Sequence, residues 1–337
     1  MPLTNLTRKQ AKIPSYITFL KISCCAAATQ HQIKSYLKQI DLVALFLYSL
    51  TFSIILILLR SLKSGVIMNP MLNIAIRAAR KAGNIIAKGY EQAPQDTQVA
   101  QKGANDYVTE IDKAAEAAII EVIRKSYPDH AIVGEESGVL AGTNNDVQWV
   151  IDPLDGTTNF VKRLPHFAVS IAIRVNGRTE VGVVYDPIRN ELFTAVRGEG
   201  TKLNEFRLRI SNERRDLQGT VLATGFPFKV AKHRIAHLNM IEALMNNGVA
   251  DFRRTGSAAL DLAYVAAGRV DGYFEIGLKP WDCAAGDLIA RESGALVTNF
   301  VGGTDYLKSG NVVAGSGRVV KEILNSIQPT LTEELKA

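Results

Sequence analysis

The stretch from Asp152 to Phe160, which reads DPLDGTTNF, constrains the fold of this chain more than any other. It follows an apolar run, Gln148 to Ile151, that is typical of a buried strand. Two carboxylates three residues apart, with a proline fixing the backbone between them, can face one point in space where such a strand ends. Gly156 lets the backbone approach a ligand closely, and the next amides can open a short helix that cradles an anion. We therefore expect a phosphate and Mg²⁺ site at this turn.

Two further motifs accompany this stretch in a fixed order. Gly134-Glu135-Glu136-Ser137 lies upstream, and Trp281-Asp282-Cys283-Ala284-Ala285-Gly286 lies downstream. Together the three motifs resemble the signatures of the inositol monophosphatase family, from about Met68 to the C-terminus. Three separated motifs in order are far more specific than any one of them. The resemblance implies an α+β fold, the layered α-β-α-β-α sandwich of the inositol monophosphatase and fructose-bisphosphatase type.

The candidate metal ligands begin with the central turn. Asp152, Asp155 and the carbonyl of Leu154 offer the hard oxygen atoms that Mg²⁺ prefers. An ordinary polar turn is the alternative, because Asp-Pro and Asp-Gly pairs are common in loops. The resemblance adds Glu135, which would also help to polarise a water molecule, and Asp282, which would contact the leaving oxygen. Asp282 could at the same time be the N-cap of the helix that begins beside it.

The resemblance also assigns roles to residues around these ligands. Thr157 would position the attacking water, Asp112 would accept the hydroxyl proton of Thr157, and Lys102 would support metal and phosphate from a loop at the edge of the site. Glu275 would accept hydrogen bonds from sugar-alcohol hydroxyls. Arg253 would orient Glu275, join a dimer contact or touch the phosphate. The expected substrate contacts are Gly156, Thr157, Thr158, Arg253, Gly256, Ser257, Ala258, Glu275 and Asp282.

The reaction that follows from this resemblance is Mg²⁺-dependent hydrolysis of myo-inositol 1-phosphate to inositol and phosphate, by direct attack of water and with inhibition by Li⁺. A haloacid-dehalogenase-type phosphatase would need its two aspartates two residues apart, whereas Asp152 and Asp155 are three apart. Fructose-bisphosphatase and 3′-phosphoadenosine nucleotidase activities stay open, because those enzymes share the metal motifs.

A function in protein assemblies is the alternative. Bacterial members of this family are associated with transcription antitermination and ribosome assembly through contacts with RNA polymerase and NusA, and the resemblance implies the same possibility here. It also implies a homodimer.

The net charge of +6 is not spread evenly along the chain. Residues 1–67 hold eight Lys and Arg and one acidic residue, Asp41, which leaves −1 for residues 68–337. The overall basicity therefore indicates nothing about partners of the larger part, and no motif predicts direct nucleic-acid binding. The cysteines, Cys24, Cys25 and Cys283, have the spacing of neither a disulfide framework nor a zinc site, which favours a reducing, cytoplasmic compartment.

The first 67 residues differ from the rest of the chain. Leu42 to Leu59 is an uncharged apolar stretch just long enough to span a bilayer. It is either a membrane segment or part of an extension encoded by upstream DNA, with the true start at Met68, and the start of the resemblance favours the second interpretation. Residues 68–337 would be the catalytic domain, with subdomains of about 68–213 and 214–337 on either side of the polar stretch Ser211–Asp216.

Apolar periodicity predicts the elements of this domain. Helices are expected from Met71 to Gly89, then over Val108–Tyr127, Ile235–Met245, Ser257–Ala267 and Ala284–Ser293, with a polar loop up to Asn105 after the first. Strands are expected over Ala131–Gly134, Gln148–Asp152, Phe167–Arg174, Thr179–Tyr185, Glu191–Val196, Thr220–Thr224, Gly272–Glu275, Ala295–Thr298 and Asn311–Ala314. Turn signals at Asn176-Gly177 and Asp186-Pro187 predict an antiparallel meander.

A protein that starts at Met68 is expected to be soluble and fully active, because the patterned helix from Met71 needs nothing upstream to complete its core. The native protein should then be cytosolic, with Met68 or Asn69 as its first residue. Intact-mass analysis of protein made from the chromosomal locus checks this expectation. A mass that matches all 337 residues, recovered from the membrane fraction, would contradict it.

Overall fold

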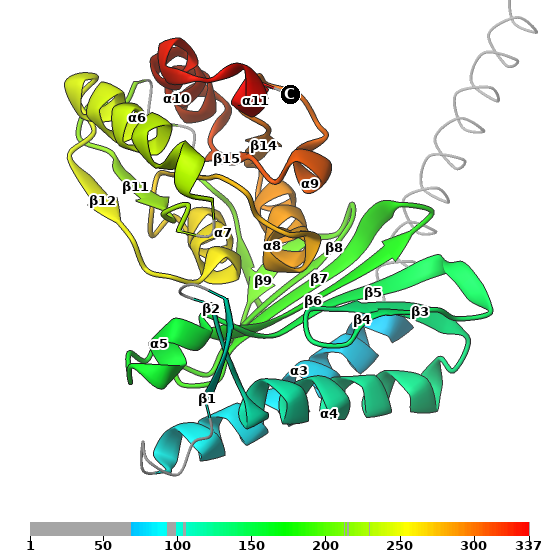
Figure 1. Cartoon of the computed structure of the whole chain (residues 1–337). Helices are drawn as coiled ribbons and strands as arrows, with labels where there is room; N and C mark the ends of the chain where they lie inside the picture. Colours follow the sequence, from blue (N-terminus) through cyan, green and yellow to red (C-terminus); the bar gives the residue numbers. More distant parts are fainter. Residues whose placement is uncertain are drawn as a thin grey trace, which may run out of the picture. The chain divides into compact units, whose positions relative to one another are not determined.

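The computed structural model describes residues 69–92, 99–103, 106–211, 213, 216–228 and 230–336, and for 99–103 and 106–108 it describes the backbone. These residues belong to one compact unit, Met68–Ala337 (Figure 1). The apolar stretch Leu42–Leu59 lies outside the described residues. Among the described helices, none is long and apolar enough to cross a membrane.

Helices and strands alternate irregularly along this unit. The helices are α3 (Pro70–Glu91), α4 (Glu110–Ser126), α5 (Thr157–Val161), α6 (Arg234–Asn246), α7 (Ala258–Ala266), α8 (Pro280–Glu292), α9 (Tyr306–Ser309), α10 (Gly317–Ile327) and α11 (Glu333–Lys336). The strands are β1 (Val99–Gly103), β2 (Asp106–Thr109), β3 (His130–Gly134), β4 (Gly138–Leu140), β5 (Asn144–Asp155), β6 (Ala168–Val175), β7 (Arg178–Asp186), β8 (Glu191–Val196), β9 (Gly200–Leu203), β10 (Phe206–Leu208), β11 (Val221–Thr224), β12 (Asp251–Arg253), β13 (Gly272–Glu275), β14 (Leu296–Thr298) and β15 (Val312–Gly315).

Two large sheets carry the fold. The first has eight strands in the order β10-β9-β8-β7-β6-β5-β3-β4, and the second has five in the order β12-β11-β13-β15-β14. The first is antiparallel throughout except where β3 runs parallel to β5, so the predicted meander is confirmed for β6, β7 and β8. In the second sheet β11 is parallel to both β12 and β13, while β15 is antiparallel to β13 and β14.

Five layers result, and the predicted α-β-α-β-α sandwich is confirmed (Figure 1). Helices α3 and α4 cover one face of the eight-stranded sheet, α7 and α8 lie between the two sheets, and α6 and α10 cover the outer face of the five-stranded sheet. One hydrophobic core fills each of the four interfaces between successive layers. The central helix α8 is buried continuously from Cys283 to Ala290, as expected for a helix packed on both sides.

The sequence supplies clear start signals for the outer helices. Asn69 caps α3 by accepting a hydrogen bond from the Met71 amide at 3.0 Å, and Pro70 occupies the first turn, where its missing N–H is harmless. Thr109 and Asp112 form a capping box at the start of α4. This second cap also fixes Asp112 on the buried side of its helix.

Two differences from the predicted elements affect the site. Helix α8 begins at Pro280 rather than at Ala284, so Asp282 lies inside its first turn and is not the N-cap, contrary to our expectation. The expected polar loop up to Asn105 contains strand β1, which pairs with β2 directly after the loop, and Lys102 therefore lies in a strand rather than in a loop. The hairpin is short and partly polar, and only its cross-strand pairing reveals it.

A further difference is that β5 continues to Asp155 instead of ending at Asp152, and most of the other differences are short elements. Strands β4, β9, β10 and β12 and helices α9, α10 and α11 were not predicted, because most are three or four residues long and have too few positions to show a period. Helix α3 continues two residues past Gly89, which is within the usual uncertainty of helix ends.

Candidate active site

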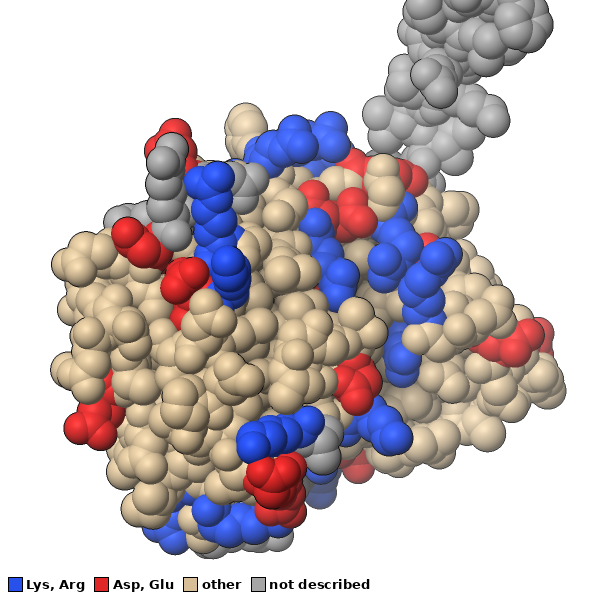
Figure 2. Space-filling model, turned by 90° about the horizontal axis from the view of Figure 1, so that it is seen from above, with Lys and Arg blue, Asp and Glu red and all other residues tan. Residues whose placement is uncertain are grey.

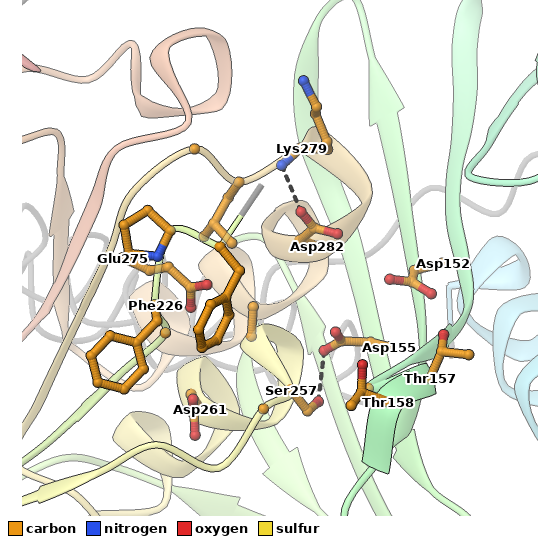
Figure 3. Close-up of a pocket in the computed structure, with 18 of the residues that line it drawn as sticks. Asp152, Asp155, Thr157, Thr158, Phe226, Ser257, Asp261, Glu275, Lys279 and Asp282 are labelled. Atoms are coloured by element: carbon orange, nitrogen blue, oxygen red, sulfur yellow. Dashed lines mark hydrogen bonds between the residues drawn. The ribbon is translucent and has the colours of Figure 1, made fainter. Parts of the chain in front are cut away.

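A bulge in β5 brings the two aspartates of the central turn to one side of the sheet. Asp152 lies opposite Ser170 of β6, and Asp155 lies opposite Ala168, so three steps along β5 match two along β6. Side chains alternate along a strand, and the extra residue therefore returns Asp155 to the face that Asp152 occupies. Both carboxylates are buried and line the same pocket (Figure 3).

The pocket has two walls. One wall comes from the end of β5 and the segments that follow β3 and β5, and the other comes from elements that follow β11 in the sequence. The β3–β5 side contributes Glu135, Asp152, Leu154, Asp155, Gly156, Thr157 and Thr158. The opposite side contributes Gly225, Phe226, Pro227, Phe228, Val230, Arg254, Gly256, Ser257, Ala258, Asp261, Glu275, Ile276, Gly277, Leu278, Lys279 and Asp282. Of the predicted site residues with described side chains, all but Asp112 and Arg253 therefore line this pocket (Figure 3).

The acidic residues in this pocket disfavour one another's charge. Burial raises the pKa of Asp152 well above its usual value, and the nearby Glu135, Asp155 and Asp282 raise it further. Burial likewise raises the pKa of Asp155 to about 7, although hydrogen bonds from Ser257 and Ala259 oppose the shift. A bound cation would offset both effects, and the donors are hard oxygen atoms that suit Mg²⁺. Within the described residues, no three His, Cys, Asp or Glu side chains are gathered as a metal-binding group.

The start of α7 orients Asp155. Its Oδ2 atom accepts a hydrogen bond from the Ser257 hydroxyl at 2.6 Å and another from the Ala259 amide at 2.8 Å. Both donors come from the other side of the pocket, and both are buried. Ser257, predicted as a substrate contact, is thus also the residue that fixes the direction of Asp155 (Figure 3).

Thr157 and Asp112 form the hydrogen bond that the resemblance implied. The Thr157 hydroxyl lies 3.0 Å from Oδ1 of Asp112 and 3.1 Å from the carbonyl oxygen of Leu154. The other oxygen of Asp112 accepts from the backbone amide of Thr109 at 2.9 Å. With its proton engaged by an acceptor, the hydroxyl can accept a hydrogen bond from a water molecule in the pocket.

Glu116 is a residue of this site that the sequence analysis missed. It lies one turn after Asp112 on α4, is buried, and accepts hydrogen bonds from the amides of Glu136 at 3.0 Å and Ser137 at 2.8 Å. One carboxylate thereby holds the loop that carries Glu135. The spacing of four residues from Asp112 is the sequence signal that could have indicated it, since such residues share a helix face.

We expect Glu116→Gln to weaken Mg²⁺ binding by about 10- to 100-fold, the usual effect of losing a partner that orients a metal ligand. Glutamine retains one acceptor oxygen, so one of the two loop amides loses its partner. Isothermal titration with Mg²⁺ measures the change directly. Glu121→Gln on the exposed side of α4, where Glu121 pairs with Lys81 and Lys125, is the matched control. Equal affinities in both variants would contradict the role of Glu116.

Asp282 and Glu275 are held by their own elements. Oδ2 of Asp282 accepts a hydrogen bond from the Lys279 amide at 2.6 Å, which fixes the carboxylate at the start of α8 (Figure 3). The hydroxyl of the buried Tyr273 donates to Oε2 of Glu275 at 2.6 Å. The carboxylate of Glu275 also lies directly over the backbone of Gly225.

Arg253 does not line the pocket, so the structure gives no support to the expected contact with substrate. It is exposed at the end of β12, and its guanidinium forms an ion pair with Asp251. A role in orienting Glu275 or in a dimer contact stays a prediction. The next residue lies just beyond the strand. That residue, Arg254, does line the pocket, with its guanidinium carbon 5.1 Å from the ring centre of Phe228.

Comparison with known proteins decides the family. The sequence model of the inositol monophosphatase family matches residues 67–333. The chain belongs to the inositol monophosphatase family. The match extends over nearly all of the compact unit, and it confirms the family predicted from the three motifs.

Proteins similar to this chain carry two kinds of name. The chain is 71% identical over 272 residues to the Nus factor SuhB of Pasteurella multocida (strain Pm70), and the match covers 80% of this chain and 100% of the relative. The solved structure of the extragenic suppressor protein suhB from Bartonella henselae has 40% identity, covers 78% of this chain and 100% of that chain, and superimposes with a TM-score of 0.75. The solved structure of an inositol monophosphatase from Anabaena (Nostoc) has 36% sequence identity. It covers 77% of this chain and 95% of that chain, and it superimposes with a TM-score of 0.67.

Proposed function

We propose that the protein is a Mg²⁺-dependent phosphomonoesterase that hydrolyses myo-inositol 1-phosphate to inositol and phosphate. The observation that carries this proposal is that Glu135, Asp152, Asp155 and Asp282 all line one pocket, beside the hydrogen-bonded pair of Thr157 and Asp112. The family assignment supports a phosphatase, and the choice of metal and of substrate is our own.

The chain's residues divide the work of the reaction. Glu135, Asp152, Asp155, Asp282 and the carbonyl of Leu154 would hold the metal. Bound Mg²⁺ would neutralise charge on the phosphate and lower the pKa of a water molecule. Thr157 would orient that water for in-line attack. The Thr157 hydroxyl donates its proton to Asp112, so the hydroxyl oxygen can accept a hydrogen bond from the water. Attack by water gives free phosphate directly and requires no covalent intermediate.

The alcohol part of the substrate would lie between Glu275 and Asp282. Glu275 is half-buried at the end of β13, where its carboxylate can accept hydrogen bonds from ring hydroxyls. Gly256, Ser257 and Ala258 line the same pocket, and Lys102, for which the structure describes the backbone, would support the phosphate from β1. We further propose that the protein acts as a cytoplasmic homodimer.

Phosphate release tests this function. The purified protein should hydrolyse myo-inositol 1-phosphate, lose the activity in a chelator and regain it with Mg²⁺. A panel with fructose 1,6-bisphosphate and 3′-phosphoadenosine 5′-phosphate identifies the preferred substrate. Activity that persists in the chelator would overturn the metal mechanism. Insensitivity to Li⁺ would leave hydrolysis in place and count against an inhibition typical of the family.

Asp282→Asn and Glu275→Gln are expected to have opposite kinetic effects. Asp282 is assigned to the leaving oxygen, where charge develops mainly in the transition state, so its change should lower kcat more than it raises KM. Glu275 contacts ground-state hydroxyls, so its change should chiefly raise KM for inositol 1-phosphate. Steady-state kinetics on both variants check the pair, and a pure KM effect of Asp282→Asn would refute its assignment.

We propose transcription antitermination and ribosome assembly, through contacts with RNA polymerase and NusA, as a second function. The observation that favours it is the 71% identity to a protein named Nus factor SuhB over that protein's full length. On the face that Figure 2 shows, Lys and Arg side chains lie among Asp and Glu rather than in one continuous basic surface, which suits protein partners better than nucleic acid. If cells with Asp155→Asn keep normal growth and ribosome assembly, this function does not need the phosphatase.

A further inference from the structure

Asn159 connects the two walls of the pocket through its side-chain hydrogen bonds. It lies in α5 and is 4% exposed. Its side-chain nitrogen donates to the carbonyl oxygen of His166 at 2.7 Å and to that of Thr255 at 2.8 Å. Two carbonyl acceptors require the amide nitrogen at this position, so the orientation of the side chain is fixed by its partners. Thr255 and His166 belong to loops from opposite walls.

Two glycines lie beside the segments that Asn159 connects. Gly156 and Gly256 have φ angles of 98° and 93°, in the left-handed region that favours glycine. A Cβ atom on Gly156 would lie 3.2 Å from the carbonyl oxygen of Gly256, and one on Gly256 would lie 3.0 Å from Nδ2 of Asn159. A side chain at either position would therefore be crowded, by the Gly256 carbonyl in one case and by the amide of Asn159 in the other.

The connection continues into the layer between the sheets. The hydroxyl of Thr255 donates to Asp261, a buried carboxylate on the first turn of α7. The same helix start orients Asp155 through Ser257 and Ala259. A polar path thus leads from α5, which begins at Thr157, through Asn159 and Thr255 to α7. It ties the wall that holds the attacking water to the wall that binds the substrate.

We propose that Asn159 is a positioning residue for phosphate-ester hydrolysis, which clamps these two loops at the separation that the reaction needs. This inference rests on the proposed phosphatase function. Asn159 touches neither substrate nor metal in this arrangement. Its loss would let the Gly256 loop shift relative to Thr157, so that the bound phosphorus and the water lose alignment. Misplacement of about 1 Å can lower turnover on the order of 10²-fold while binding is largely retained.

Asn159→Ala with Asn299→Ala as its control tests the clamp. Asn299 is also 4% exposed and also binds a loop, through Val301, Gly303 and Asp305, but it lies at a turn outside the pocket. Both variants should lose thermal stability. Only Asn159→Ala should lose kcat, on the order of 10²-fold, with KM for inositol 1-phosphate changed by less than about threefold. Equal kcat losses in the two variants, or a loss confined to KM, would overturn the proposal.

Asn159→Asp keeps the test decisive if the alanine variant does not fold. It preserves the volume of the side chain but can donate one hydrogen bond at most, so at least one of the two carbonyls loses its donor. A large fall in kcat with nearly unchanged KM supports the clamp, and wild-type kcat overturns it. A wild-type protein without phosphatase activity would overturn the proposed function, and the role of Asn159 with it. An active wild-type protein with unaffected Asn159 variants would overturn the clamp alone.

Discussion

Replacing Asp155 by asparagine is expected to lower kcat/KM for phosphate-ester hydrolysis by more than about 10²-fold. Loss of a partner that merely orients a metal ligand costs 10- to 100-fold, so loss of a ligand should cost more. Asparagine retains the size of the side chain and an oxygen that can accept from Ser257 and Ala259, so the loop around it should persist. Phosphate release at saturating Mg²⁺ measures the loss.

The same variant should be more stable than the wild type when metal is removed. Burial raises the pKa of Asp155 from its ordinary 3.8 to about 7. The folded state therefore binds this proton more tightly than the unfolded state, and wild-type stability should fall as pH rises through that window and stay low above it. Asparagine has no such titration. Above pH 7 without metal, the free energy of unfolding of the variant should exceed that of the wild type by on the order of a few kcal/mol.

Thermal unfolding in a chelator at several pH values tests this expectation. The melting temperature of the wild type should decline between about pH 4 and 7, while that of the variant should decline less. Residual decline in the variant is expected, because Asp152 has a raised pKa as well. If the variant is inactive and also less stable at pH 8 without metal, Asp155 is a structural residue and its assignment as a ligand is wrong.

Thr157→Val should have the second-largest effect. It removes the hydroxyl that meets Asp112 at 3.0 Å and keeps the shape of the side chain. Thr157 is assigned to orient the attacking water, and misplacement by about 1 Å can cost on the order of 10²-fold, so kcat should fall by about 10²-fold with a smaller change in KM. Rapid-quench measurement of the hydrolytic step checks that the chemistry itself is slowed.

A matched control exists elsewhere in the same sheet region. The Thr143 hydroxyl donates to Asp129 at 2.8 Å in an exposed turn, so Thr143→Val removes a similar hydrogen bond away from the pocket. Thr143→Val should leave kcat unchanged. If both valine variants behave alike, the hydroxyl of Thr157 has no part in the reaction.

The acidic lining of the pocket could be predicted because its candidate ligands lie in short, specific motifs. Asp152 and Asp155 share one turn, and the family resemblance carried Glu135 and Asp282 with them. The analysis did not predict Glu116 or Asn159, because both act on backbone amides or carbonyls of distant segments. The spacing of Glu116 from Asp112 and the position of Asn159 in the central motif are sequence signals, but neither signal names the distant backbone groups that these side chains bind. Pairing between distant segments also explains why the β1–β2 hairpin was missed.

The pocket-lining arginine differs from the predicted one by one residue, and the start of α8 differs by four. Arg254, which lines the pocket, directly follows the exposed Arg253 at the end of β12, and composition cannot distinguish two adjacent arginines. Helix α8 starts four residues early because proline is favoured in a first turn, whereas the prediction followed the apolar pattern alone. Strand ends and helix starts were thus the weakest parts of the prediction.

The burial of α8 between the two sheets gives ligand binding a mechanical consequence. Asp282 is anchored to this inner helix, whereas Asp152 and Asp155 lie at the end of β5 in the larger sheet. An ion held by both groups would add a further link between these two layers. Occupancy at 100 times the dissociation constant adds about 2.7 kcal/mol to the free energy of unfolding. The concentration of free Mg²⁺ in the cell would therefore set how often the sandwich opens, as well as how fast it turns over substrate.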